Sequence, residues 1–368
     1  MSDGYRKYLQ NVIPRVSRHP DVQSILCAAP ASISLDKEVE RLPNVQFLYC
    51  QSLKLFPKNN DIVLNASLGK LDPDVVYVPV ERYYRFQNIP VVNMIQNMEP
   101  FIHAFKGNPV SEKIKNWLRI KYAKKAINNA DRIIAISQFV KNFLTSRLAT
   151  PDHKIGVVYH GSDISESKDV GSPVTIPFHW QNRFLFTAGS IRPARGLEDV
   201  LYAIKHLSNY YGAAPGLVIA GSPTPAMIRY YKTLINWLDK NNLSSKVLWV
   251  GHLSKSQMAW CYQHCLAFIM TSRVEAFGQI AVEAMSHGCL CLAANNPCLP
   301  EIFSDAAVYY NSGAWKELSD LITCILSWDQ SKKKHLSQRA LERASQFSWD
   351  VCAEKTVEQL QFIARQNK

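Results

Sequence analysis

Short β-type runs alternate with helical stretches along nearly the whole chain, and this alternation constrains the fold more than any other feature of the sequence. Strands that alternate with helices are typical of parallel α/β sheets, because each crossover connection places a helix on a sheet face. The first half predicts helices over residues 6–16 and 111–129. It also predicts strands in the runs SILCAA, VQFLYC, DIVLNAS, DVVYVPV, PVVNMIQ, RIIAIS and KIGVVYHG.

A polar segment rich in Ser, Gly and Pro, GSDISESKDVGSPVTIPFHWQN, then interrupts the pattern and reads as an interdomain linker. The alternation restarts in the runs RFLFTAGS, GLVIAGS, KVLWVGH, CLAFIMTS, CLCLAAN and AAVYYN. We therefore predict two doubly wound domains, residues 1–168 and 169–349, followed by a helix over residues 350–368. A Rossmann-type unit normally opens with a strand that leads into a glycine turn. Here Gly4 precedes a helix, so the expected first strand is missing.

Composition favours a globular cytoplasmic protein. Hydrophobic residues make up 47% of the 368 residues, which excludes global disorder. No apolar run approaches the roughly 18 residues that span a bilayer, and the first residues contain no apolar core of a signal peptide. The nine cysteines are scattered and odd in number, as expected for reduced thiols.

The net charge of +12 fits nucleic acid, an anionic membrane surface or anionic ligands such as sugar diphosphates. Residues 106–125 concentrate this charge, with seven Lys or Arg against one acidic residue. This segment is either a peripheral contact with anionic lipid, on the inner face of the membrane, or the solvated face of a packed helix. The basic residues show no recognised nucleic-acid-binding module, so we expect no nucleic acid as partner.

Three glycine turns follow strands directly in the second half, in FTAGSIRPARG, VIAGS and WVGHLS. Ligands of open parallel sheets bind at the carboxyl ends of the strands, where these turns would lie. Arg192 and Arg195 follow the first turn, and two guanidinium groups there suit a diphosphate. An ordinary loop with two solvated arginines is the alternative.

The segment TSRVEAFGQIAVEAMSHG combines two carboxylates and a glycine at the start of a helix, which we expect near Phe277. Gly278 lets a phosphate approach the first helical turn, where unpaired N–H groups and the positive end of the helix dipole favour an anion. Glu275 precedes this helix and Glu283 lies two turns along it. A carboxylate near sugar and ribose hydroxyls accepts two hydrogen bonds and fixes their orientation.

EAFGQIAVE resembles the EX7E motif of the family 4 retaining glycosyltransferases, the glycosyl transferases group 1. GSIRPARGLEDVLYAI is similar to the diphosphate loop of that family. ADRIIAISQFVKNFL resembles its last amino-domain strand and helix, and VVYHGSD resembles its entry to the linker. VLWVGHLSKSQMAWCYQHCLAFIMTS is similar to its base-binding turn and following helix, and FSWDVCAEKTVEQL resembles its last helix. The resemblance implies an α/β GT-B fold, in which two Rossmann-like domains with parallel sheets face a central cleft. It also implies that the final helix crosses back to the N-terminal domain.

The resemblance assigns catalytic roles to Glu275, on the transferred sugar, and to Arg195, on the diphosphate. It places Ser190 where the family usually has Arg, so Arg192 would take over that charge by a different route. It places Gln96 and Asn97 where the family commonly has a His-Asp pair, and nearby Glu99 or His103 would face the cleft on the acceptor side instead. The donor-binding residues that it implies are Gly4, Gly189, Arg192, Arg195, His252, Leu253, Glu275, Ala276, Phe277, Gly278, Gln279, Ile280 and Glu283.

The predicted function is retaining transfer of a hexose from a nucleotide-sugar donor, UDP-glucose being favoured, to a saccharide or lipid-linked saccharide in polysaccharide biosynthesis. No cofactor is expected, and Asp72-Pro73-Asp74, formally a DxD metal motif, reads as a turn before a strand. A nucleotide-sugar epimerase and a non-catalytic, sugar-nucleotide-binding subunit of GT-B fold are the alternatives. Release of nucleotide in the presence of an acceptor would separate the transferase from both.

Overall fold

The structure, a computed structural model, divides into two compact α/β units. Unit 1 comprises Met1–Asn97, Leu118–Gly161 and Phe347–Lys368, and unit 2 comprises Met98–Trp117 and Ser162–Gln346. The residues that the structure describes are 3–50, 62–84, 86, 88–102, 107–162, 171–173, 175–211 and 214–366. The predicted boundary between residues 168 and 169 lies outside these residues.

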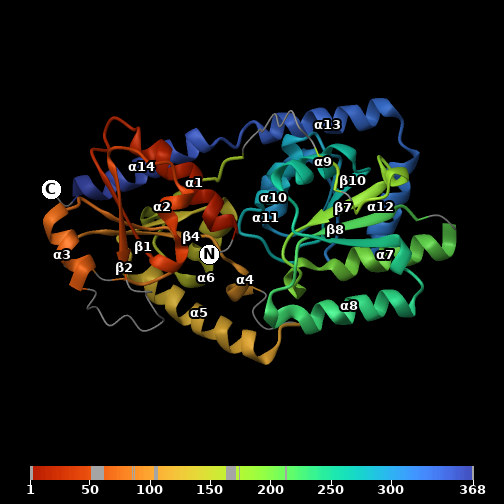
Figure 1. Cartoon of the computed structure of the whole chain (residues 1–368), viewed down its shortest axis with the longest axis horizontal. Helices are drawn as coiled ribbons and strands as arrows, with labels where there is room; N and C mark the ends of the chain where they lie inside the picture. Colours follow the sequence, from red (N-terminus) through yellow and green to blue (C-terminus); the bar gives the residue numbers. More distant parts are fainter. Residues whose placement is uncertain are drawn as a thin grey trace. The chain divides into compact units, whose positions relative to one another are not determined.

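Unit 1 contains two parallel sheets (Figure 1). The first pairs β1 (Ile25–Pro30) with β2 (Val45–Cys50), and the second has the order β3-β4-β5-β6, with strands β3 (Val76–Val78), β4 (Val91–Ile95), β5 (Arg132–Ala135) and β6 (Ile155–Val157). Among the described residues, the α-helices of this unit before α14 are α1 (Asp3–Ser17), α2 (Leu35–Glu38), α3 (Ile62–Leu71) and α6 (Gln138–Leu148). Helix α4 (Glu99–Ile102) belongs to unit 2, and α5 (Val110–Asn129) begins in unit 2 and ends in unit 1.

The run DIVLNAS is wrong as a strand, because residues 62–71 form the helix α3. Its less exposed leucines, Leu64, Leu68 and Leu71, recur at spacings of four and three residues, which places them on one face of a helix. The apolar run at the start of this segment hid that periodicity. The described residues of the first half therefore form six strands, where seven were predicted.

The C-terminal helix α14 (Trp349–Gln366) belongs to unit 1, as expected of a final helix that returns to the N-terminal domain. It packs against α1, where Arg15 forms an ion pair of 2.6 Å with Asp350. Gln359 accepts hydrogen bonds of 2.9 and 2.6 Å from the guanidinium of Arg132 at the start of β5.

Unit 2 holds a parallel six-stranded sheet of order β12-β11-β10-β7-β8-β9. Its strands are β7 (Phe184–Ala188), β8 (Gly216–Ala220), β9 (Val247–Gly251), β10 (Ala267–Met270), β11 (Cys291–Ala294) and β12 (Ala307–Tyr310), as the second half of the sequence predicted. The helices that follow these strands are α7 (Leu197–Tyr211), α8 (Ile228–Lys240), α9 (Lys255–His264), α10 (Gln279–Ser286), α11 (Cys298–Phe303), α12 (Trp315–Ser327) and α13 (Gln330–Ala344).

Helices cover both faces of this sheet, and successive residues of each strand point to opposite faces. Leu185 packs with α7, α8 and α12 in one buried apolar cluster, and its neighbours Phe184 and Phe186 contact Trp260 and Tyr262 of α9. Figure 1 shows α7 and α8 on one side of the strands and α9 and α10 on the other. This arrangement leaves the carboxyl ends of the strands as the edge from which loops emerge.

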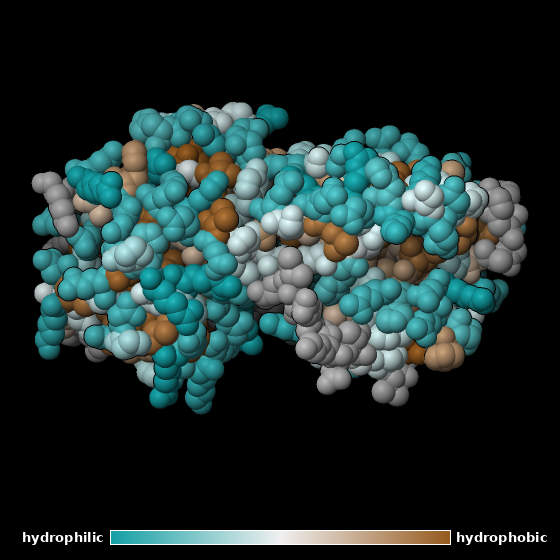
Figure 2. Space-filling model, turned by 90° about the horizontal axis from the view of Figure 1, so that it is seen from above, coloured by the Kyte–Doolittle hydropathy of each residue, from teal (hydrophilic) through white to brown (hydrophobic). Residues whose placement is uncertain are grey.

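Polar side chains cover most of the molecular face in Figure 2, and apolar residues form scattered patches on it. Across the described parts of the chain, no helix combines the length and apolarity needed to cross a membrane.

Candidate active site at the carboxyl edge of the second sheet

The three predicted glycine turns lie side by side at the carboxyl edge of β7, β8 and β9. The N–H of Gly189 donates to Ala220 O at 3.0 Å, and the N–H of Gly221 donates to Gly251 O at 2.7 Å. All three glycines have positive φ, of 129°, 123° and 67°. A Cβ on Gly221 would lie 2.0 Å from Gly189 O, so only glycine allows the first two turns to approach this closely.

Arg195 extends from the loop after β7 toward the turn after β10. Its Nη1 donates to Ser272 Oγ at 3.1 Å and forms an ion pair with Glu275. Only 25% of the Arg195 side chain and 13% of the Glu275 side chain are exposed. The two residues to which the family resemblance gave catalytic roles thus meet in the structure, although they are 80 positions apart in the sequence.

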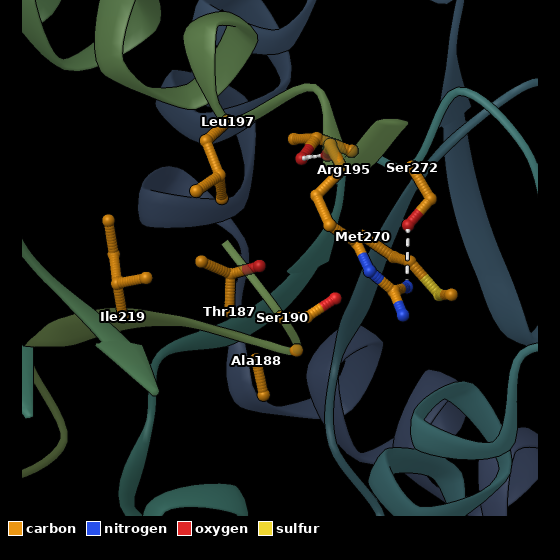
Figure 3. Close-up of a pocket in the computed structure, with 10 residues that line it drawn as sticks. Thr187, Ala188, Ser190, Arg195, Leu197, Ile219, Met270 and Ser272 are labelled. Atoms are coloured by element: carbon orange, nitrogen blue, oxygen red, sulfur yellow. Dashed lines mark hydrogen bonds between the residues drawn. The ribbon is translucent and has the colours of Figure 1, made fainter. Parts of the chain in front are cut away.

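Figure 3 shows Arg195 and Ser272 pointing toward one another across a small pocket at this edge. The pocket is lined by residues from the ends of β7, β8 and β10 and from the arginine loop: Thr187, Ala188, Gly189, Ser190, Arg195, Leu197, Ile219, Met270, Thr271 and Ser272. It lies where open parallel sheets bind their ligands.

Helix α10 begins at Gln279, two residues later than expected, with Gly278 as its N-cap residue at φ 89°. The N-terminal N–H groups of a helix find their acceptors outside the helix and favour an anion. Ala276 and Phe277 are buried and anchor the turn, whereas Gln279 and Ile280 are half-buried in the first helical turn. The glycine before the helix and the nearby Arg195 together form a site suited to a diphosphate.

Glu283 lies on α10 and accepts a hydrogen bond of 3.4 Å from the hydroxyl of Tyr262. Burial, and then the Glu283 carboxylate, raise the pKa of Tyr262, so this phenol stays a donor. Burial also lowers the pKa of His287 at the end of α10, partly offset by Glu283. His252 is exposed and Leu253 half-buried in the turn between β9 and α9.

Arg192 is paired with a carboxylate in the structure. Its guanidinium forms an ion pair with Glu99 of α4, and the exposed fractions of the two side chains are 23% and 12%. Its contact with the diphosphate stays a prediction. His103, the other acceptor-side candidate, lies outside the described residues.

Gly4 is also placed differently, because it lies in the first turn of α1 and not in a glycine loop. It belongs to unit 1, whereas the other predicted donor residues belong to unit 2, so its role stays a prediction. Asp72 lies just after α3 with φ 44° and donates its N–H to Leu68 O at 2.9 Å, as in a helix-ending turn. Within the described ranges, no three or more His, Cys, Asp or Glu side chains are grouped to hold a metal ion.

Several residues that surround Arg195 were not predicted from the sequence. The Thr271 hydroxyl donates to Arg195 O at 2.6 Å, and the guanidinium of Arg273 contacts Asp199 at 2.7 and 2.5 Å. Burial opposes and Asp199 favours the charged form of Arg273, whose pKa is raised overall. The sequence did contain a signal for this pair, because Arg273 lies two residues before Glu275 and Asp199 lies in the first turn of the helix after Arg195.

Two family descriptions match the chain. Glycosyltransferase Family 4 matches residues 8–166, and Glycosyl transferases group 1 matches residues 177–343. Together they cover most of the sequence, and each covers one of the two halves in which the strand–helix pattern repeats.

Among curated relatives, an uncharacterized glycosyltransferase of Methanocaldococcus jannaschii is 27% identical over 65% of this chain and 62% of its own length. O-antigen chain mannosyltransferase B of Escherichia coli is 23% identical, over 65% of this chain and 64% of its own length. D-inositol 3-phosphate glycosyltransferase of Mycolicibacterium smegmatis is 26% identical, over 63% and 53%. The chain thus spans less than two thirds of each of these relatives.

Solved structures show the same fold. The Anabaena protein HepE, solved in complex with UDP-glucose, superposes with a TM-score of 0.74 at 18% identity, over 98% of this chain and 97% of HepE. A glycosyltransferase of Rickettsia africae superposes with a TM-score of 0.70 at 16% identity, over 98% and 95%. The fold is GT-B, with two Rossmann-like units built on parallel sheets, as the sequence predicted.

Proposed function

This chain belongs to the family 4 glycosyltransferases, glycosyl transferases group 1, and from that membership we propose that it transfers a hexose from a nucleotide-sugar donor to a saccharide or lipid-linked saccharide, with retention of configuration. The observation that carries this proposal is the meeting of Arg195 and Glu275 beside the glycine-capped start of α10. Cation, carboxylate and helix start are the three groups needed to bind a diphosphate and its sugar together.

Arg195 and the N-terminal turn of α10 would hold the diphosphate in this assignment. Glu275 would accept hydrogen bonds from hydroxyls of the transferred sugar, and Glu283, oriented by Tyr262, from those of the ribose. The turn at His252 and Leu253 would contact the base.

The chemistry proposed is loss of the diphosphate through an oxocarbenium-like state, stabilised by positive charge around the leaving group. The acceptor hydroxyl attacks on the face from which the diphosphate departs, and a phosphate oxygen of the donor takes its proton. Arg195 and the start of α10 already supply positive charge at this position. We therefore expect turnover without added metal.

UDP-glucose is the first donor to test, because HepE binds it in the same fold. The mannosyltransferase among the relatives makes a mannose donor the main competitor. A thermal-shift screen of nucleotide sugars against wild-type protein, followed by nucleotide release with lipid-linked oligosaccharides, decides the donor and acceptor. Stabilisation by a donor with no nucleotide release for any acceptor would favour a non-catalytic binding subunit, and conversion of the donor sugar would favour an epimerase.

An exposed face of α5 supports a lipid-linked acceptor. Val110, Ile114 and Trp117 are 72%, 57% and 56% exposed and recur at helical spacing, and Lys121 and Lys124 continue the same stripe. Apolar side chains next to lysines are the composition of helices that lie in an anionic membrane interface. This face would bring the protein to a lipid acceptor in polysaccharide biosynthesis.

Co-sedimentation with vesicles tests this face. Wild-type protein should bind phosphatidylglycerol vesicles and not phosphatidylcholine vesicles, and the double variant Ile114→Ser and Trp117→Ser should bind neither. Equal binding by the double variant and the wild type would remove this part of the proposal and leave the transferase assignment untouched.

A further inference from the structure

A second ion pair, more deeply buried than the first, lies behind Arg195 and Glu275. We propose that Arg273, fixed by Asp199, is a positioning residue that sets the turn carrying Glu275 against the loop carrying Arg195. The proposal rests on the proposed function, because it concerns the alignment of the two groups on which that function depends.

Asp199 is the fixed point of this arrangement. It lies in the first turn of α7, is 2% exposed, and accepts hydrogen bonds from Arg273 Nη1 at 2.7 Å and from Arg273 Nη2 at 2.5 Å. The hydroxyl of Tyr310 and the N–H of Gly313 donate to the same carboxylate, each at 3.0 Å. The start of a helix also favours a negative charge there. Four donors and the helix end leave this side chain one orientation.

The turn after β10 connects this fixed point to the arginine loop. The backbone N–H of Arg273 donates to Ala194 O at 2.8 Å, and Thr271 Oγ1 donates to Arg195 O at 2.6 Å. Between these contacts, a Cβ on Gly196 would lie 2.5 Å from Thr271 O and 2.9 Å from Arg273 Nε. The loop and the turn are therefore in direct contact on both sides of the position that carries the Arg195 side chain.

The pair joins three loops at the same edge. Arg273 belongs to the loop after β10, Asp199 follows the loop after β7, and Ser312, which accepts from Arg273 Nη1 at 3.0 Å, belongs to the loop after β12. Stability alone does not explain a buried ion pair at this position, since such pairs are often replaced by apolar residues without loss of stability. A fixed geometry explains it, because Arg273 stands two residues before Glu275 in a short turn.

Nucleotide binding and bond cleavage should differ in how much displacement of these loops they tolerate. Binding of a flexible nucleotide adjusts to small shifts of the loops, whereas bond cleavage needs Glu275 and Arg195 in place together. A displacement of about 1 Å can lower a rate by about 100-fold. Loosening Arg273 should therefore reduce kcat and leave nucleotide affinity nearly unchanged.

The test compares Arg273→Lys with Arg343→Lys. Lysine keeps the charge of Arg273 but loses its two-pronged contact with Asp199. Arg343 is a matched control in the same unit, because its guanidinium also holds a neighbouring segment, donating to Ile302 O at 2.9 Å and Glu301 O at 2.6 Å at the end of α11. The measurements are the kcat and KM of UDP-glucose hydrolysis, and of the screened donor if another is preferred, with UDP affinity by calorimetry.

We expect kcat to fall about 10- to 100-fold in Arg273→Lys, with KM and the Kd of UDP within about threefold of the wild type, and Arg343→Lys to keep the wild-type kcat. An unchanged kcat in folded Arg273→Lys overturns the proposal, as does an equal loss in Arg343→Lys. Should Arg273→Lys fail to fold, Tyr310→Phe decides, because it removes one donor to Asp199 and keeps the ring. A several-fold lower kcat in Tyr310→Phe supports the proposal, and an unchanged kcat overturns it. A wild-type protein that turns over no donor would instead refute the proposed function, and this inference with it.

Discussion

Replacing Arg195 by alanine removes the cation that the structure places between the glycine turns and Glu275. The guanidinium is mostly buried, with 25% of the side chain exposed, so solvent screens it only partly. In the free protein it is already paired with Glu275. A diphosphate must therefore share or displace that contact, and the net effect of the substitution is a difference between two ion-pair environments.

The magnitude follows from a single contact between charged groups, which is worth about 1.5–3 kcal/mol. Because the diphosphate replaces an existing contact with Glu275, we expect a loss in the lower part of this range. A loss of about 2 kcal/mol corresponds to about 30-fold in donor affinity. Turnover should fall further, because the leaving diphosphate gains negative charge as its bond breaks. Arg195→Lys should recover part of both losses, since it restores the charge without the fork geometry.

Calorimetry with UDP and nucleotide release from the donor measure the two effects. Arg183→Ala is the matched control, because Arg183 is an exposed arginine that precedes β7, whereas Arg195 follows it. The double variant Arg195→Ala and Glu275→Gln should bind UDP more tightly than Arg195→Ala alone, since no unpaired carboxylate then repels the phosphates. If Arg195→Ala keeps wild-type UDP affinity and wild-type turnover, the diphosphate is bound elsewhere and the reasoning is refuted.

Three further outcomes are expected. Glu275→Ala should abolish transfer while UDP binding, by calorimetry, stays within about tenfold of the wild type; wild-type turnover in this variant would contradict the role of Glu275 on the sugar. Turnover should persist in excess EDTA, and a complete loss that added metal reverses would return attention to Asp72 and Asp74. Because burial lowers the pKa of His287 below 6.5, the unfolded chain binds a proton that the folded chain does not, so stability should fall as pH drops through 6.5. Between pH 7.5 and 5.5, the melting temperature of His287→Gln should therefore decline less than that of the wild type. An identical decline in the two proteins would contradict a lowered pKa of His287.

Local patterns predicted the parts of the site that local sequence determines. The glycine turns after β7, β8 and β9, and the strand–turn–helix around Gly278, each depend on residues within one short segment. The start of α10 was misplaced by two residues, because Gly278 takes a left-handed conformation as the N-cap instead of joining the helix. In the same way, the apolar start of DIVLNAS masked a helical periodicity that appears only over the full length of α3.

Local sequence patterns did not predict the ion pairs between residues that are far apart in the sequence. Arg192 meets Glu99 across 93 positions, and Arg273 meets Asp199 across 74. Each residue alone reads as an ordinary surface charge, and only the folded chain decides whether an arginine serves a ligand or another carboxylate. The sequence therefore predicted the fold and the edge that carries the site more reliably than the partner of each charged side chain.

The most direct test of retaining transfer is a proton NMR time course of wild-type protein with its selected donor and acceptor, run beside Glu275→Ala. Nucleotide release should be accompanied by a new anomeric signal with the configuration of the donor sugar, and the Glu275→Ala sample should show neither. A first-formed product of inverted configuration, or a wild-type sample in which the donor stays intact with every acceptor, would contradict retaining transfer.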